Sequence, residues 1–201
     1  MKILLIDDHK LFAFSISMIL NQYKEVEKID IINNINELEK IDILDYDIFL
    51  IDINLTNISE ESGLEIAEKL IKNYKNIYVV ILTGHVKFMY EQIANKIGAR
   101  GFIDKNIEPI EFINILNIIY NGGTYFKNIN NYIYEKLTIT EINILNLVRK
   151  GKSIEEISKT VFISKRTVSN HLNNIYSKLG VNNKQEAVYN AEKLGYFLDF
   201  S

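Results

Sequence analysis

Three carboxylates and two further polar side chains have the composition of a phosphoryl-transfer site. Asp7 and Asp8 follow one short apolar run, Asp52 ends another, and Thr83 and Lys105 follow two more. Converging carboxylates repel one another unless one is protonated or a hard cation such as Mg²⁺ binds them. We favour the cation, because it keeps Asp52 ionised as a nucleophile and screens an incoming phosphoryl group. Lys105 then offers a point charge, and Thr83 a hydroxyl, to the phosphoryl oxygens.

The first 120 residues predict the elements that must position these side chains. Short apolar runs alternate with amphipathic stretches, which is typical of a parallel sheet covered on both faces by helices. The runs predict strands at Ile3–Ile6, Ile29–Ile32, Ile48–Ile51, Ile77–Leu82 and Gly101–Ile103. The stretches between them predict helices at Leu11–Tyr23, Ile35–Leu44, Gly63–Tyr74, Lys87–Ile97 and Pro109–Tyr120. We therefore expect an α/β fold with a doubly wound five-stranded parallel sheet.

The expected strand order explains why the polar residues should meet. All five follow or end a strand, and open α/β sheets bind ligands beyond the carboxyl ends of their strands. For the order 2-1-3-4-5 the crevice lies between the first and third strands, which carry the three carboxylates. The sequence thus predicts one acidic site at this edge of the sheet.

The rest of the chain has a different periodicity. Apolar residues recur at helical spacing, and the pattern predicts a small all-α domain of four helices at Thr140–Arg149, Ile154–Thr160, Lys165–Leu179 and Lys184–Leu194. We expect a first domain over residues 1–120, a linker over 121–136 and a second domain over 137–201. Residues 137–201 carry nine basic and six acidic side chains, a net charge of +3. Because the net charge of the whole chain is −3, the first 136 residues have a net charge of −6. The second domain is therefore the one suited to a polyanion.

The composition of the chain excludes several kinds of functional site and the class of membrane-spanning proteins. The 201 residues include no cysteine, which excludes disulfides, thiolate metal sites and a cysteine nucleophile. No apolar run reaches the length of about 18 residues that a membrane span needs, and the N-terminus lacks a signal-peptide pattern. We expect a cytoplasmic protein with no membrane partner.

The helix predicted at Lys165–Leu179 has a polar face suited to DNA. A tight turn separates it from the preceding helix, as in a helix-turn-helix whose second helix enters the major groove. Asparagine can pair with adenine edges, and lysine or arginine can contact phosphate or guanine. Ser164 should cap this helix and leave its N-terminus open toward a phosphate. The candidate contacts are Lys165, Arg166, Thr167, Ser169, Asn170, Asn173 and Asn174.

Four motifs of the first domain, in their order along the chain, resemble those of bacterial response-regulator receiver domains. They are IDDH at 6–9, FLIDINL at 49–55, ILTGH at 81–85 and GFIDK at 101–105. The resemblance implies that Asp52 is the phosphoacceptor and that Asp8, Asp52 and the backbone carbonyl of Asn54 ligate Mg²⁺, with Asp7 acting through water. It also implies that Thr83 and Phe102 reposition on phosphorylation and that Lys105 is the family's lysine. The chain departs from the family at Thr56, where proline is common, at Phe102, where tyrosine is frequent, and in a longer acidic loop at 57–63.

Residues 137–194 resemble the LuxR-type helix-turn-helix, the output domain of the NarL/FixJ class. The core SKRTVSNH at 164–171 and the KLGV at 178–181 carry the likeness. In that family the bases are contacted at the positions of Ser169, Asn170 and Asn173, and the last helix mediates dimerisation, here through Lys184, Val188 and Ala191. Two of these contact positions are often lysine in the family, whereas this chain has Ser169 and Asn173 there.

Together the two resemblances imply a phosphorylation-dependent transcriptional regulator. A sensor histidine kinase would be the phosphoryl donor, double-stranded DNA the target, and a homodimer the active form; the protein would not itself be an enzyme. Two alternatives stay open: a DNA-binding regulator that does not depend on phosphorylation, and an aspartyl-phosphate phosphatase, since residues 52–56 resemble the DxDxT motif without its second acid. Taken singly, each site residue has a plainer interpretation as a cap, core residue or solvated charge.

Overall fold

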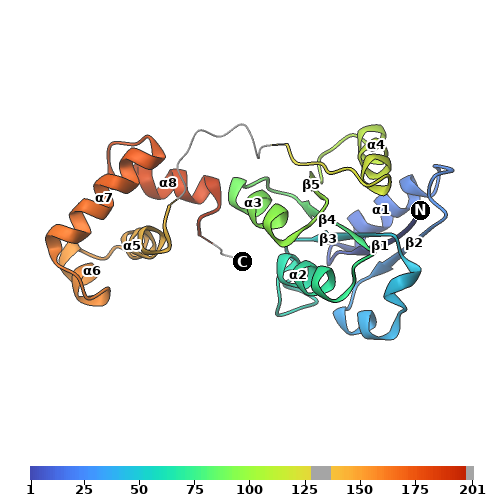
Figure 1. The fold of residues 1–201 in the computed structure, drawn as a ribbon, viewed down its shortest axis with the longest axis horizontal. Coiled ribbons are helices and arrows are strands. Elements are labelled where there is room, and N and C mark those ends of the chain that lie inside the picture. The colour runs from blue at the N-terminus through green and yellow to red at the C-terminus, as the bar shows by residue number, and fades with distance from the viewer. Residues whose placement is uncertain (128–136, 198–201) are drawn as a thin grey trace. The chain divides into compact units, whose positions relative to one another are not determined.

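The computed structural model describes residues 1–127 and 137–197, which form two compact units (Figure 1). The first unit contains the sheet and helices α1 to α4, and the second contains helices α5 to α8. Among the described residues, no helix is both long enough and apolar enough to cross a membrane.

The first unit is built on a five-stranded parallel sheet. Its strands are β1 (Lys2–Ile6), β2 (Lys28–Ile32), β3 (Ile48–Asp52), β4 (Tyr78–Thr83) and β5 (Gly101–Asp104), in the order β2-β1-β3-β4-β5. The strands β1, β3 and β4 are nearly continuous apolar runs because both faces of the sheet are covered. The predicted fold class and strand order are confirmed, and each strand lies within two residues of its predicted bounds.

Helices cover the two faces of the sheet in pairs. The helices α2 (Gly63–Asn73) and α3 (Phe88–Ile97) contribute Leu64, Leu70 and Ala94 to the core on one face. The helices α1 (Lys10–Leu20) and α4 (Pro109–Tyr120) contribute to the core on the other face. This doubly wound arrangement leaves the carboxyl ends of the strands uncovered, and there the loops carry the polar residues.

The second crossover differs from the prediction. The stretch Ile35–Leu44 was expected to be one helix, but the structure has two short 3₁₀ helices, at Ile35–Lys40 and Ile43–Asp45. The side chains of Asn34 and Asp42 each accept a bond from the backbone N–H two residues on, which starts a new turn at each position. Ile41 between them is extended, so a continuous helical ladder cannot form. The isoleucines Ile35 and Ile43 pack against the core, but the side-chain turns at Asn34 and Asp42 prevent a single helix.

The chain after α4 remains bound to the sheet. Tyr125 donates its backbone N–H to the carbonyl of Arg100 (2.8 Å) and accepts from the N–H of Phe102 (2.9 Å), so it extends the edge of β5. Tyr125 and Phe126 pack against the two cores of this unit. The first residues of the predicted linker 121–136 are thus part of the first unit, and residues 128–136 lie outside the described part of the chain.

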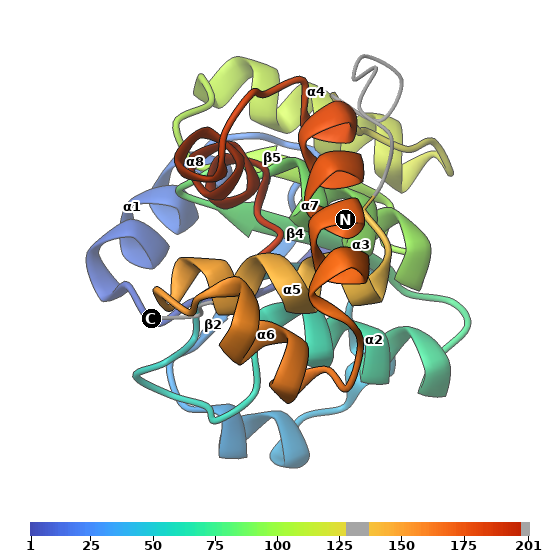
Figure 2. The ribbon, with the colours of Figure 1, turned by 90° about the vertical axis from the view of Figure 1, so that its left-hand side faces the viewer.

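The second unit consists of α5 (Ile139–Arg149), α6 (Ile154–Thr160), α7 (Lys165–Leu179) and α8 (Lys184–Leu194). The observed bounds agree with the prediction to within one residue. Figure 2 shows the short turn that joins α6 to α7. In this turn Phe162 has a φ of 56°, the left-handed conformation, and its side chain is 93% exposed.

Candidate functional site

The three carboxylates converge at the carboxyl edge of the sheet. Asp7 and Asp8 directly follow β1, and Asp52 ends the neighbouring β3. Together with His9 they each offer one metal-ligating atom, and all four atoms lie within 4.8 Å of one another. The convergence predicted from strand order is therefore present, because two adjacent parallel strands end at the same edge.

Lys105 enters this cluster from the end of β5. Its ammonium lies 2.8 Å from Asp7 Oδ2 and 2.7 Å from Asp52 Oδ2, and its side chain is 12% exposed. Asp7 and Asp52 are buried. Burial raises the pKa of Asp52 above its ordinary value of 3.8, while the bond and charge of Lys105 act in the opposite direction. One ammonium against three carboxylates leaves a deficit of positive charge.

The donor atoms fit a divalent cation. The buried oxygens Asp7 Oδ2 and Asp8 Oδ1 accept no well-aligned hydrogen bond from the described residues, although Lys105 and His9 lie close as charged neighbours. Buried oxygens without hydrogen bonds are costly unless a cation or water satisfies them. Hard oxygen ligands suit Mg²⁺, so the cluster has the charge and the donor chemistry that a magnesium site requires.

The remaining residues predicted for this site lie around it. Thr83 ends β4, and its hydroxyl donates to the carbonyl of His85 (2.9 Å) and accepts from the N–H of His85 (3.1 Å). Asn54 lies two residues beyond Asp52, and its side-chain oxygen faces the N–H of Thr56 (3.4 Å). The backbone carbonyl of Thr83 accepts from the N–H of Lys105 (2.8 Å), so Thr83 is joined to the cluster through its backbone.

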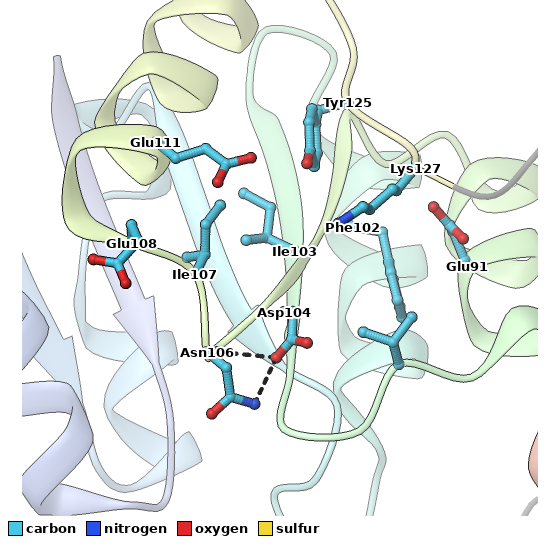
Figure 3. Close-up of a pocket in the computed structure, with 11 residues that line it drawn as sticks. Glu91, Phe102, Ile103, Asp104, Asn106, Ile107, Glu108, Glu111, Tyr125 and Lys127 are labelled. Carbon is cyan, nitrogen blue, oxygen red and sulfur yellow. Dashed lines mark hydrogen bonds between the residues drawn. The ribbon is translucent and has the colours of Figure 1, made fainter.

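Phe102, the predicted switch residue on β5, is buried with 3% of its surface exposed. It lines a cavity of about 420 Å³ that lies between β5, α4 and the segment carrying Tyr125 (Figure 3). Carboxylates dominate the polar lining, from Glu91, Asp104, Glu108 and Glu111. The aromatic ring therefore already lies inside the domain, next to the residues that follow α4.

Two contacts with the cluster were not predicted. The Nδ1 of His9 lies 2.8 Å from Asp8 Oδ1 and 3.7 Å from Asp52 Oδ2, directly against the carboxylates. Asn57 donates to Asp8 Oδ2 from both its backbone N–H (3.2 Å) and its side-chain amide (2.8 Å). His9 could have been found from its place directly after Asp8. Asn57 is 49 residues from its acceptor, and no local pattern signals that contact.

Gly63, the first residue of α2, supports the position of Asp52. Its N–H donates to the carbonyl of Ile53 (2.9 Å), and a Cβ built on it would lie 1.8 Å from the carbonyl oxygen of Asp52. Only glycine permits so close an approach of two backbone segments. Ser62, the N-cap, and Glu65 complete a capping box that fixes where the helix begins.

The helix α7 presents the polar face expected for DNA. Its apolar stripe, at Val168, Leu172, Ile175 and Leu179, is buried. The candidate contacts Lys165, Arg166, Asn170, Asn173 and Asn174 are exposed, while Thr167 and Ser169 are half-buried. Ser164 caps the helix as predicted, accepting from the N–H of Thr167 (3.1 Å). Lys165 is paired with Glu155 of α6 at 2.9 Å.

The predicted dimerisation residues on α8 differ in exposure. Lys184 is exposed, Val188 is half-buried, and both line a hollow of about 330 Å³ together with Tyr189. Ala191 is fully buried in the core of the unit, so it cannot contribute surface to an interface. It faces inward because it lies about one helical turn after the fully buried Ala187, on the side of the helix that packs against α5 and α7.

Two family models match the chain. Residues 3–117 match the response regulator receiver domain, and residues 135–191 match the luxR family of bacterial regulatory proteins. Among curated proteins, the transcriptional regulatory protein DegU of Brevibacillus brevis is 29% identical, over 97% of this chain and 94% of its own length. The oxygen regulatory protein NreC of Staphylococcus carnosus (strain TM300) is 28% identical, over 96% and 97% respectively.

Solved structures agree in fold. The response regulator RcsB of Salmonella typhimurium has a TM-score of 0.75 at 19% identity, covering 96% of this chain and 99% of its own. RcsB in complex with DNA has a TM-score of 0.72 at 19% identity, covering 96% and 98%. The chain therefore belongs to the response regulator receiver family and, with its luxR-type domain, is a DNA-binding transcriptional regulator of the NarL/FixJ class.

Proposed function

We propose that Asp52 is the phosphoacceptor and that a sensor histidine kinase is its donor. The observation that carries this proposal is the position of Asp52, which is 2% exposed, ends β3, and faces Lys105 at 2.7 Å within a cluster of carboxylates. Among the three acids only Asp52 belongs to a strand, where the backbone fixes its direction of attack.

In the proposed reaction a carboxylate oxygen of Asp52 attacks the phosphorus of a phosphohistidine. An O–P bond forms as the P–N bond breaks, and the leaving imidazole takes up a proton. We assign Asp7, Asp8, Asp52 and the backbone carbonyl of Asn54 to Mg²⁺, which when bound supplies charge neutralisation for the phosphoryl oxygens. Lys105 places its ammonium beside the same oxygens, where its hydrogen bond and charge lower the pKa of Asp52 against the raising effect of burial.

The proposed response begins at Thr83. A phosphoryl group brings a charge of about −1.5 to −2 and strong acceptor oxygens. The hydroxyl of Thr83 turns toward one of these oxygens and releases its bonds to the backbone of His85. Phe102, whose backbone N–H donates to the carbonyl of Tyr125, then repositions as the switch aromatic. Tyr125 begins the segment that leads to the second unit, so this route reaches the DNA-binding helices through the chain itself.

For the second unit we propose that α7 reads double-stranded DNA in the major groove. Its exposed basic and asparagine side chains, and the N-terminus capped by Ser164, support this role. A net +3 is small for one half-site, so we propose that the active form is a homodimer on two half-sites, with Lys184 and Val188 at its interface. DNA as the target places this action in the cytoplasm.

Labelled acetyl phosphate tests the proposal in the absence of a known kinase. With Mg²⁺ present, the full chain should take up label, and the Asp52→Asn variant should not. Footprinting on genomic DNA with and without the donor should show protection that increases on phosphorylation. Uptake of label by Asp52→Asn would reject Asp52 as the acceptor, and protection that is identical in both states would favour a regulator that works without phosphorylation.

A further inference from the structure

The turn between α6 and α7 contains a residue in an unusual backbone conformation. Phe162 has a φ of 56°, and it is the only residue other than glycine with a positive φ in the part of the chain that the structure describes. The left-handed region is costly for a residue with a bulky side chain, whereas glycine, asparagine or aspartate adopts it more readily. The side chain of Phe162 is 93% exposed, so packing within the protein does not offset that cost.

The turn requires the left-handed conformation but not the phenylalanine. Val161 is the C-cap of α6, and Phe162 occupies the next position, where helices commonly end on a left-handed glycine. The backbone N–H of Ile163 donates to the carbonyl of Ser158 (3.1 Å), which is the bond that closes such a helix end. Val161 and Ile163 pack against the core of the second unit, so both sides of the turn are fixed. Glycine would complete this turn at lower cost, and folding therefore does not explain the aromatic ring.

The position of Phe162 in the helix-turn-helix brings its ring to the DNA-binding face. Phe162 lies two residues before Ser164, the N-cap of α7, in the turn that precedes the N-terminal end of that helix (Figure 2). In a helix-turn-helix the N-terminal residues of the second helix contact base edges in the major groove. A side chain that projects from the turn directly before them lies at the edge of the same groove.

The surroundings of the ring favour DNA over a protein as its partner. Lys165 and Arg166 are exposed close to it along the chain, and both are positively charged. In the described stretch 161–179, Phe162 is the only large apolar side chain that is strongly exposed. A protein partner is usually marked by a contiguous apolar patch. The major groove instead presents isolated apolar groups, the C5 methyl groups of thymine, and phenylalanine is among the side chains that contact them.

We propose that Phe162 contacts the C5 methyl group of a thymine at the edge of the half-site and makes the protein select thymine there. The inference rests on the proposed function, because it extends the DNA contacts of α7 to the turn before it. The fixed turn presents the ring in place, so little backbone freedom is lost on binding. Burial of one methyl group changes an affinity by about fourfold, which sets the expected size of the effect.

Uracil substitution tests the contact, because deoxyuridine differs from thymidine only in lacking the methyl group. The full chain, treated with acetyl phosphate and Mg²⁺, selects a double-stranded oligonucleotide from a random pool, and the selected DNA is resynthesised with single thymines replaced by uracil. At one thymine or more, the replacement should weaken binding of the wild type about fourfold. Phe162→Asn and Phe162→Gly keep the left-handed turn without the ring and should lose this sensitivity. Phe162→Tyr keeps the ring and should retain it.

The matched control is Ile139→Asn, since Ile139 is 80% exposed on α5, outside the helix-turn-helix. Its affinity and its response to uracil should equal those of the wild type. Thermal unfolding verifies the fold, and the midpoint of Phe162→Gly should be no lower than that of the wild type, because glycine relieves the left-handed strain.

Two results would overturn the role of Phe162: a wild type that responds to uracil at no position, or a response that persists unchanged in Phe162→Asn and Phe162→Gly. Variants that bind DNA as the wild type does but no longer regulate a reporter gene would assign the ring to a protein partner and would also overturn it. The double variant Lys165→Ala, Asn170→Ala tests the proposed role of α7 separately. Wild-type affinity in that double variant would reject α7 as the reading helix, whereas a loss of affinity without any response to uracil would reject the thymine contact alone.

Discussion

Gly63→Ala tests how the backbone positions the phosphoacceptor. The new methyl carbon would lie 1.8 Å from the carbonyl oxygen of Asp52 and 2.7 Å from its carbonyl carbon, and ordinary contact begins at 3.4 Å. The start of α2 and the end of β3 must therefore separate by about 1.6 Å. Both atoms that are struck belong to the backbone, so no side-chain rotation relieves the overlap.

The magnitude follows from that displacement. Overpacking in a close-packed region costs about 1–3 kcal/mol, and here the separation also stretches the 2.9 Å bond from the Gly63 N–H to the Ile53 carbonyl. We expect the free energy of unfolding to fall by about 3 kcal/mol. Misplacing a reacting group by about 1 Å costs on the order of a hundredfold in rate, so phosphorylation of Asp52 should slow by about that factor.

Urea unfolding followed by circular dichroism measures the first effect, and the rate of label uptake from acetyl phosphate measures the second. Gly84→Ala is the control, because a Cβ at Gly84 meets no atom within 4 Å, and this glycine follows Thr83 at the same edge of the sheet. The control should unfold as the wild type does. If Gly63→Ala were as stable as Gly84→Ala and were labelled at the same rate, the close approach of α2 to Asp52 would not exist.

Three further changes have expected outcomes. Asp52→Asn should raise the free energy of unfolding in EDTA at pH 7, because burial raises the pKa of Asp52 above 3.8 and so penalises its charged form. The folded state holds the Asp52 proton more tightly than the unfolded state does, so this penalty is absent below pH 3.8, grows as the pH rises from 3.8 toward the folded pKa and is complete above it. Urea unfolding should therefore show the gain shrinking as the pH falls toward 4. Glu141→Gln and Lys178→Met should couple by about 1–3 kcal/mol in a double-mutant cycle of unfolding, because Glu141 is 2% exposed and lies 2.9 Å from the Lys178 ammonium. Additive effects of the two substitutions on the free energy of unfolding would show that the two side chains do not interact. Glu155→Gln should release Lys165 from its ion pair and strengthen DNA binding severalfold at low salt. A plot of the logarithm of the DNA-binding constant against the logarithm of the salt concentration should become steeper by up to about 1, and an unchanged slope would contradict a phosphate contact by Lys165.

The sequence predicted those strands and helices in which the spacing of apolar residues matches the face that the fold buries. The buried runs of β1, β3 and β4 and the helices of the second unit carry strong periodicity, so their positions could be inferred directly. The stretch Ile35–Leu44 has helical spacing but is interrupted by side-chain turns at Asn34 and Asp42, which periodicity does not register.

The candidate site was predictable to the extent that strand ends determine it. Asp7, Asp8 and Asp52 meet because β1 and β3 are neighbours, and that order follows from the fold class. The contact from Asn57 to Asp8 depends on the path of a loop, which no propensity specifies. The burial of Ala191 could have been inferred by assigning each position of α8 to a face before placing it at an interface.

The transfer of a phosphoryl group to Asp52 is the central claim, and chemical mapping tests it most directly. The full chain is treated with acetyl phosphate and Mg²⁺, reduced with borohydride, which converts an aspartyl phosphate to homoserine, and analysed by peptide mass spectrometry. The arrangement of Asp52 beside Lys105 predicts homoserine at position 52 alone, and none when the metal is chelated. Homoserine at position 7 or 8, or at no position despite an intact fold, would contradict the account.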